Sequence, residues 1–388
     1  AVLQLGKEVD EKLLAGDVRL TMGGEPTFVA TSDRDAPEWN TEALGPTKRG
    51  FATELVHKLR AQYGDGGFLH FGQGKWYPGE QLPRWALSIF WRTDGQCIWK
   101  NPALFADERN PKKYTANDAE QFTVALSRKL GLSSDYITPG YEDVWYYLWR
   151  ERRLPVNVDP FDSKLDDEME RIRLRRVFSQ KLDSVVGYVL PLQPESHHPL
   201  LGTSWTTGPW FFRDERMYLI PGDSPMGYRL PLDSLPWVNK NDFPYLIEQD
   251  PFAPRSELPR AAHLPSAAPL KRQTETGKAT LSVESSAARS SMGPATSKTS
   301  STTELPSPQS QESAHWLTRT ALCVEARDPM RANGPEAEKN HGGENGVLYV
   351  FMPPLANLED YLELLHAVEE TAVELAFQLV LEGYPPPR

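Results

Sequence analysis

One stretch of the sequence, residues 253–314, limits how the rest of the chain can fold. It is rich in Ser, Thr, Ala, Pro and Lys and holds almost no large apolar residue. Such a segment cannot bury enough apolar surface to offset the entropy lost on ordering, so we expect a disordered insertion. The folded core must then come from residues 1–252 and 315–388, and we interpret these as two parts of the same region.

The composition of the whole chain is that of a folded protein. Its 388 residues include 11 Trp, 14 Tyr and 15 Phe, which can fill a large core. Acidic residues outnumber basic ones by 53 to 42, and a net charge of −11 disfavours a general nucleic-acid binder. The two cysteines, Cys97 and Cys323, make no disulfide framework and indicate a reducing, cytoplasmic setting.

The chain carries no sign of membrane attachment or secretion. No stretch approaches the roughly 18 apolar residues of a membrane-spanning helix, and the N-terminus has no signal-peptide pattern. The sequence starts inside a predicted helix and stops just after an apolar run. We therefore expect no membrane partner, and we interpret the chain as a fragment of a longer protein.

Hydrophobic periodicity predicts an α+β fold, with antiparallel strands and flanking helices. Helices are expected over 3–15, 45–62, 115–130, 141–152, 163–180 and 357–375. Strands are expected over 18–22, 68–71, 86–99, 185–192, 209–220, 320–325 and 347–351. The last two strands would pair across an extended loop, 328–346, and Asp94-Gly95 indicates a hairpin turn within 86–99.

The helix expected over 45–62 has a clear apolar pattern. Phe51, Leu55, Val56 and Leu59 recur at helical spacing, and Gly64 follows directly after its end. These four side chains mark the expected apolar face of that helix.

Several common chemistries are excluded by the absence of their motifs. Gly72-Gln73-Gly74-Lys75-Trp76 lacks the spacing and the hydroxyl residue of a phosphate loop. No Cys-x-x-Cys, His-Glu-x-x-His or Gly-x-Ser-x-Gly motif occurs, so the usual zinc sites and the serine nucleophile elbow are excluded.

A first candidate site residue is Glu25, which follows Gly23-Gly24 and precedes Pro26. The glycines allow close approach of another group, and proline holds the preceding residue extended. A carboxylate placed in this way suits a magnesium or substrate contact. A tight turn with a solvated glutamate explains the same residues equally well.

Two Trp-rich or Pro-rich strings supply further candidates. In the string 74–85, Lys75 and Arg84 lie close to tryptophans, which suggests a wall of a binding cleft. In the string 221–237, Asp223 sits in a rigid turn, and Arg229 could pair with an anion or with Asp223. An aromatic surface loop and a purely architectural turn are the respective alternatives.

Two more acids, Glu325 and Glu382, have apolar neighbours. Glu325 lies on a predicted strand, and Glu382 follows the apolar run 379–381. Carboxylates that project from neighbouring strands are what a magnesium site with several ions requires. Taken singly, each could also be a structural acid with satisfied hydrogen bonds.

Six strings together resemble a large bacterial family described as amidoligases. They occupy residues 20–28, 72–80, 221–225, 229–237, 350–354 and 381–387. The family is assigned to carboxylate–amine ligases with a glutamine-synthetase-like fold, and its members usually carry a transglutaminase-like domain upstream. The resemblance covers nearly the whole chain apart from 253–314 and 328–346.

The resemblance implies an ATP-dependent ligase that joins a carboxylate to an amine on a small molecule or peptide, with Mg²⁺ and ATP as cofactors. For this reaction we assign Glu25 and Glu325 as metal ligands, and Lys75, Arg84, Asp223 and Arg229 as substrate or nucleotide contacts. The upstream domain and the family's segment after residue 387 are missing from this chain, so we expect the chain alone to be inactive.

A second interpretation belongs to another functional class. The Trp-rich loops could grip a peptide or glycan for the attached transglutaminase-like domain, in a module without catalysis of its own. The two interpretations differ in one requirement, because a ligase must bind magnesium and nucleotide and a binding module need not.

Overall fold

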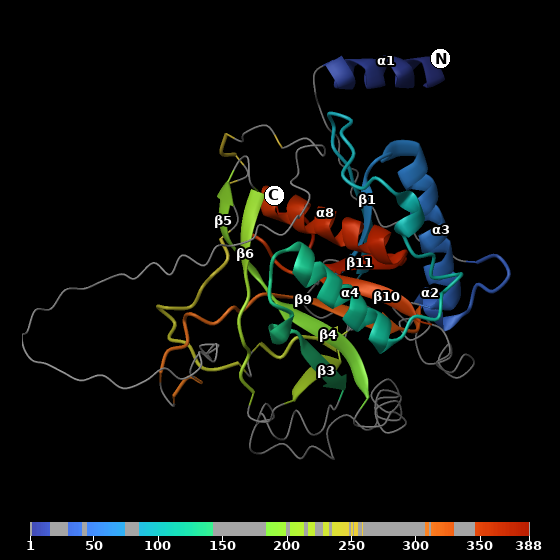
Figure 1. Ribbon diagram of the computed structural model, residues 1–388. Coiled ribbons are helices and arrows are strands. Elements are labelled where there is room, and N and C mark those ends of the chain that lie inside the picture. Colours follow the sequence, from blue (N-terminus) through green and yellow to red (C-terminus); the bar gives the residue numbers. More distant parts are fainter. Residues whose placement is uncertain are drawn as a thin grey trace, which may run out of the picture.

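The computed structural model describes the chain in several segments. The described residues are 2–15, 30–40, 45–73, 85–142, 184–198, 202–212, 216–221, 228–232, 235–247, 250, 252–254, 258, 307–309, 312–329 and 346–387. They form a mixed α/β architecture around one nine-stranded sheet, with a separate two-stranded hairpin (Figure 1).

The large sheet has the strand order β2-β1-β11-β10-β9-β4-β3-β7-β8. Its strands in chain order are β1 (Phe68–Gln73), β2 (Trp85–Phe90), β3 (Thr138–Glu142), β4 (Val185–Pro191), β7 (Met217–Pro221), β8 (Tyr228–Arg229), β9 (Ala321–Arg327), β10 (Val347–Met352) and β11 (Leu379–Gly383). The hairpin consists of β5 (Gln193–His198) and β6 (Gly202–Thr206). Because β4 pairs with β9, strands from both sides of residues 253–314 share this sheet.

The expectation of antiparallel strands is met only in part, because the sheet is mixed. β11 runs parallel to both β10 and β1, and β3 runs parallel to β7. A long helix connects β10 to β11, and a helical crossover of this kind is what a parallel pair requires. The apolar run at 379–381 is the second strand of that unit.

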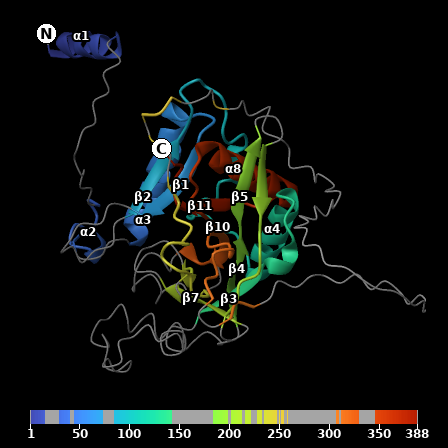
Figure 2. The ribbon, with the colours of Figure 1, turned by 90° about the vertical axis from the view of Figure 1, so that its left-hand side faces the viewer.

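The helices are α1 (Val2–Ala15), α2 (Pro37–Asn40), α3 (Pro46–Tyr63), α4 (Ala116–Lys129) and α8 (Leu358–Leu375), with 3₁₀ turns at Pro102–Leu104 and Ser134–Tyr136. Figures 1 and 2 show α4 and α8 side by side on one face of the sheet. The helix α3 packs beside β1 and β2 at one end of the sheet. Among the described helices, none is both long and apolar enough to cross a bilayer.

Capping residues explain where two of the predicted helices begin and end. The Asp118 carboxylate accepts a hydrogen bond from the Thr115 backbone at 2.7 Å, which caps the start of α4, and Gly131 follows the helix with φ 69°. The helix α8 starts after Asn357 and ends at Ala376, which has φ 54°. Both helices and the antiparallel pair β9–β10 are confirmed.

Two strand predictions were wrong in their extent. The hairpin expected within 86–99 does not form, because β2 pairs with β1 and the Asp94-Gly95 turn leads instead to Ile98 and Trp99, whose N–H groups bind the Gly66 carbonyl. Within the strand expected over 209–220, the described residues 209–212 and 216 belong to no strand, and β7 begins at Met217.

Three more expected elements cannot be compared with the structure in full. The strand over 18–22 and the helix over 163–180 lie outside the described residues, as does 143–152. Tyr141 and Glu142, at the start of the helix expected over 141–152, belong to β3 instead.

The core lies on both faces of the central strands. Alternate residues of β9 separate the two faces, because Leu322 and Val324 join the cluster beneath α4 and α8, while Ala321 and Cys323 join a cluster on the opposite face. Ser313 and Ala314, at the end of the expected insertion, are held against 237–242, where the Ala314 N–H donates to the Trp237 carbonyl at 2.9 Å.

Candidate functional site

A buried cluster of charged side chains lies on the sheet face opposite α4 and α8. Arg327 on β9 donates to both oxygens of Glu382 on β11, at 2.8 and 2.6 Å. The same guanidinium contacts Glu325 at 3.2 Å. These three side chains are 7%, 1% and 1% exposed, so one guanidinium compensates two carboxylates away from bulk water.

Strand alternation explains why these three residues meet. Glu325 and Arg327 are two residues apart on β9, so they share a face. The strand β10 lies between β9 and β11, with Tyr349 opposite Glu325 and Phe351 opposite Glu382. The two acids therefore stand on strands that flank β10, and the long side chain of Arg327 bridges the gap between them.

Gly187 on β4 makes room for Glu325 on the other side of β9. The two residues pair directly across the strands. A Cβ atom at position 187 would lie 2.9 Å from Glu325 Cγ and 2.9 Å from the Val324 carbonyl oxygen, closer than normal packing allows. The glycine is thus a packing requirement of the Glu325 side chain.

Tyr349 extends the cluster toward α3. The Arg327 guanidinium lies 3.6 Å from the centre of the Tyr349 ring, and the Tyr349 hydroxyl donates to Glu108 Oε1 at 2.6 Å. Glu108 in turn accepts from Arg49 Nε and Nη2 at 2.6 and 2.7 Å. A continuous path of buried polar groups therefore runs from α3 to β11.

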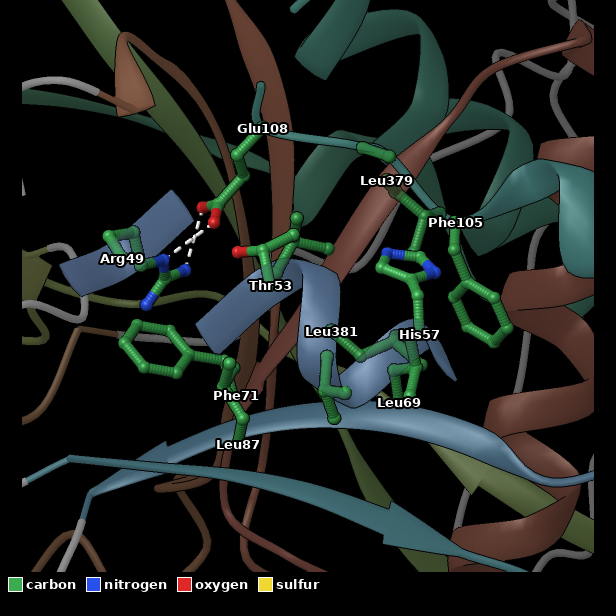
Figure 3. A pocket seen from close by; sticks show the side chains of 13 residues that line it. Arg49, Thr53, His57, Leu69, Phe71, Leu87, Phe105, Glu108, Leu379 and Leu381 are labelled. Carbon is green, nitrogen blue, oxygen red and sulfur yellow. Dashed lines mark hydrogen bonds and ion pairs between the residues drawn. The ribbon is translucent and has the colours of Figure 1, made fainter. Parts of the chain in front are cut away.

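A small pocket lies beside the Arg49–Glu108 pair, between α3 and the strands β1, β2 and β11 (Figure 3). Its empty volume, open solvent included, is about 370 Å³. Arg49 stacks on Phe71 with 3.7 Å between the guanidinium carbon and the ring centre. Thr53, His57 and apolar side chains of the strands complete the lining, so the pocket has one ionic end and a mostly apolar wall.

Burial and pairing set the protonation of the cluster. Burial opposes ionisation of Glu108, but Arg49 and the hydrogen bonds from Arg49 and Tyr349 outweigh it and hold the Glu108 pKa below its usual value. Burial and then Glu108 raise the pKa of Tyr349 well above normal. Burial acts against the charge of Arg327, yet Glu382 and Glu325 raise its pKa.

Cys323 lies on the same face, in surroundings that oppose formation of its thiolate. Its side chain is buried, and its thiol is 3.8 Å from Glu325 Oε1. Burial, and then the nearby Glu325 and Glu382 carboxylates, raise the pKa of the thiol well above 9.0. A buried thiol with a raised pKa is less reactive than an exposed thiolate.

Of the residues proposed from sequence, Glu325 is at the centre of the cluster, and Glu382 joins it through Arg327. Arg229 lies on β8, where its backbone pairs with Ile220. The side chain of Arg229 is outside the described part of the chain, as are Glu25, Lys75, Arg84 and Asp223.

Four cluster residues were not anticipated from sequence. Arg327 had a usable signal, because it lies two residues after Glu325, where the observed strand β9 continues past the predicted end at 325. Tyr349, Glu108 and Arg49 had none, since their approach depends on the pairing of β9 with β10 and on the placement of α3. Among the described residues, no group of three or more His, Cys, Asp and Glu could hold a metal ion.

Comparison of this chain with known proteins identifies its family and nothing narrower. Neither curated proteins nor solved structures give a match. One family model matches the sequence over residues 1–388. The chain therefore belongs to the family described as "Putative amidoligase enzyme (DUF2126)".

Proposed function

We propose that this chain forms part of an ATP-dependent carboxylate–amine ligase, with its site at the buried cluster of Arg49, Glu108, Arg327, Glu325 and Glu382. Membership in the amidoligase family supports the reaction class. The substrates would be a carboxylate and an amine, on small molecules or peptides. A transglutaminase-like domain in the parent protein would be the functional partner.

The observation that carries the proposal is the sharing of Arg327 between two buried carboxylates. Buried ion pairs of this kind give little net stability compared with apolar packing, because each charge loses its hydration. Buried ionisable groups held in specific charge clusters of this kind are candidates for functional sites. The adjacent pocket supplies a place where an apolar part of a substrate could lie next to the charges.

Magnesium fits the donor chemistry of this cluster. Mg²⁺ is usually held by one or two carboxylates together with water and substrate phosphates, and Glu325 and Glu382 supply two carboxylates from one sheet face. Glu325 and Glu382 would hold the ion, with Glu25 as the further ligand proposed from the sequence. When bound, it would neutralise phosphate charge during phosphoryl transfer.

The protein's own side chains would stabilise the charge of the reacting groups and hold them in position. Arg327 would bind phosphate or acyl-phosphate oxygens in exchange for one of its carboxylate partners, because a guanidinium pairs with either anion in the same planar geometry. Tyr349, held neutral, would keep the Glu108 carboxylate aligned on Arg49. Lys75, Arg84, Asp223 and Arg229 remain proposed contacts for the nucleotide or substrate.

The proposal is tested by calorimetric titration of Mg-ATP into the full-length protein that contains this sequence. We expect binding, and we expect Glu325→Gln to weaken it by about tenfold or more, because one charged ligand is lost. Glu374→Gln is the matched control, since Glu374 is 49% exposed and lies away from the cluster on α8.

Two outcomes would contradict the proposal. A protein that binds no nucleotide with magnesium would fit the non-catalytic binding module instead. Equal affinities of the Glu325 and Glu374 variants for Mg-ATP would show that the buried cluster does not take part in nucleotide binding.

A further inference from the structure

The helix α3 presents an apolar stripe to solvent. Phe51, Leu55, Leu59 and Tyr63 recur every four residues and are 56%, 47%, 37% and 60% exposed. Three of them form the apolar pattern noted in the sequence, and of that pattern only Val56 is buried, at 8% exposed. An apolar pattern of this kind usually faces the core, but here the other three residues face solvent.

The residues on the opposite side of α3 explain why its apolar side chains are exposed. This side faces the sheet with Arg49, Thr53, Val56 and Arg60, all buried. Arg49 pairs with Glu108, and Arg60 donates to the Gly67 carbonyl at 2.9 Å. Because specific polar contacts hold the inner side, the large apolar side chains are left outside, and a contiguous exposed patch of this kind marks an interaction surface.

The helix α1 lacks a packing partner for its apolar side. None of its residues is buried, and Figures 1 and 2 show it apart from the other elements. Val2, Leu5, Val9 and Leu13 lie on one side at helical spacing. An isolated helix of 14 residues is marginal in water, so α1 needs a packing partner to persist.

We propose that α1 packs its apolar side on the exposed stripe of α3 in the same chain. The lengths agree, because at 1.5 Å per residue α1 is roughly 21 Å long and residues 51–63 span roughly 18 Å. The charges also agree, since α1 carries three acidic and two basic residues, and apart from the sheet-facing Arg49 and Arg60 the helix α3 carries Lys48 and Lys58 against Glu54.

The connection between the two helices favours the same chain over a second copy. The helix α2 contacts α3, and Glu38 on α2 accepts a hydrogen bond from the Lys48 backbone at 2.8 Å. The segment that follows α1 is thus anchored at the start of α3. A tether of this kind gives a high effective concentration of α1 at the stripe without any second molecule.

The contact is tested by photo-crosslinking in the full chain. A benzoylphenylalanine placed at Val9 should crosslink to residues 48–63. The matched control places the same group at Leu14, which is on the other side of α1, is 85% exposed and should not give this product. Mixing ¹⁵N-labelled and unlabelled protein separates crosslinks within one chain from those between copies.

The outcomes decide the proposal in both directions. Crosslinks from position 9 to α3 within one isotopic species support it. Crosslinks between labelled and unlabelled chains, equal yields from positions 9 and 14, or products elsewhere on the protein would each overturn it.

Hydrogen exchange gives a second measurement that does not depend on a crosslinker. Val9→Asp should cause loss of amide protection in α1 and uncover the stripe of α3, while Leu14→Asp should leave both unchanged. Equal effects of the two substitutions would contradict packing through the Val9 side.

Discussion

The guanidinium carbon of Arg327 lies 3.6 Å from the centre of the Tyr349 ring, so a single tyrosine joins two buried ion pairs. Its face contacts the cation that pairs with Glu382, and its hydroxyl donates to Glu108, the partner of Arg49. Groups connected in this way lose stability non-additively when they are removed one by one. The pairs on β9–β11 and on α3 are therefore expected to behave as one energetic unit.

Tyr349→Phe tests that unit by removing only the hydroxyl. Glu108 loses one of its hydrogen bonds in a buried setting, so we expect a loss of about 1–3 kcal/mol in the free energy of unfolding. Urea denaturation measures the change, with Tyr245→Phe as control because Tyr245 is 68% exposed. Equal stability of the two variants would mean that the hydroxyl contributes nothing.

Glu382→Gln should destabilise the protein more than Glu325→Gln. Glu382 accepts two bonds from Arg327, at 2.8 and 2.6 Å, whereas Glu325 makes one contact with it at 3.2 Å. Without the Glu382 carboxylate, the buried Arg327 cation keeps only the weaker contact with Glu325. Breaking a buried ion pair in this way lowers the free energy of unfolding by about 3–5 kcal/mol. Thermal melting of both variants gives the order, and a larger loss for Glu325→Gln would contradict this account of Arg327.

Gly187→Ala should also destabilise the protein, through crowding at Glu325. The added methyl group would lie 2.9 Å from Glu325 Cγ and from the Val324 carbonyl oxygen, and overpacking of this kind costs about 1–3 kcal/mol. Gly208→Ala is the matched control, because a Cβ at that position has no atom within 4 Å. Chemical denaturation of the two variants measures the difference in stability. Equal stability would show that the structure around position 187 accommodates the methyl group without loss.

Local signals in the sequence predicted individual helices and strands better than they predicted how the strands are arranged in the sheet. Thr115, Asp118 and Gly131 bracket α4, and the pairing of β9 with β10 follows from two apolar runs around one loop. The parallel strand β11 was missed because its run of three apolar residues is too short to distinguish from a helix end. Its direction depends on the crossover through α8.

The site was predictable only where its residues share a strand or an apolar run. Glu325 and Glu382 stood out as acids among apolar neighbours, which is a local signal. Arg49 could not be found in this way, because the amphipathic pattern of α3 indicates the wrong buried face when specific polar contacts hold the other one. That conflict between pattern and burial is itself a mark of a functional or interacting helix.

His70 gives the protein a specific sensitivity to acid. Burial lowers the pKa of His70 from 6.5 to about 4, against a smaller opposing effect of the hydrogen bond with the Tyr384 backbone. The unfolded chain then takes up this proton at a higher pH than the folded protein does. The stability associated with neutral His70 is fully present above pH 6.5 and is lost as the pH falls toward 4.

Denaturation of wild type and His70→Phe at several pH values isolates this effect. Between pH 6.5 and 4 the wild type should lose about 3 kcal/mol more than the variant, because each pKa unit corresponds to 1.36 kcal/mol. Titration of the other groups largely cancels in the comparison. Parallel stability curves would show that His70 is not held neutral by burial.

Removal of residues 260–306 should leave the fold intact. Their composition offers little apolar surface to a core, and loop-closure entropy changes slowly with length, so a short Gly/Ser linker can replace them. The deletion must stop before Ala314, which is fully buried and donates its N–H to the Trp237 carbonyl at 2.9 Å.

Two deletions compared by thermal melting test where the dispensable segment ends. Deletion of 260–306 should shift the melting temperature little, whereas deletion of 260–314 should lower it, because Ser313 and Ala314 then no longer bind 237–242. A large loss from the shorter deletion would show that the segment contributes to the folded structure. Equal melting temperatures for both deletions would show instead that the contacts of Ser313 and Ala314 are not needed for stability.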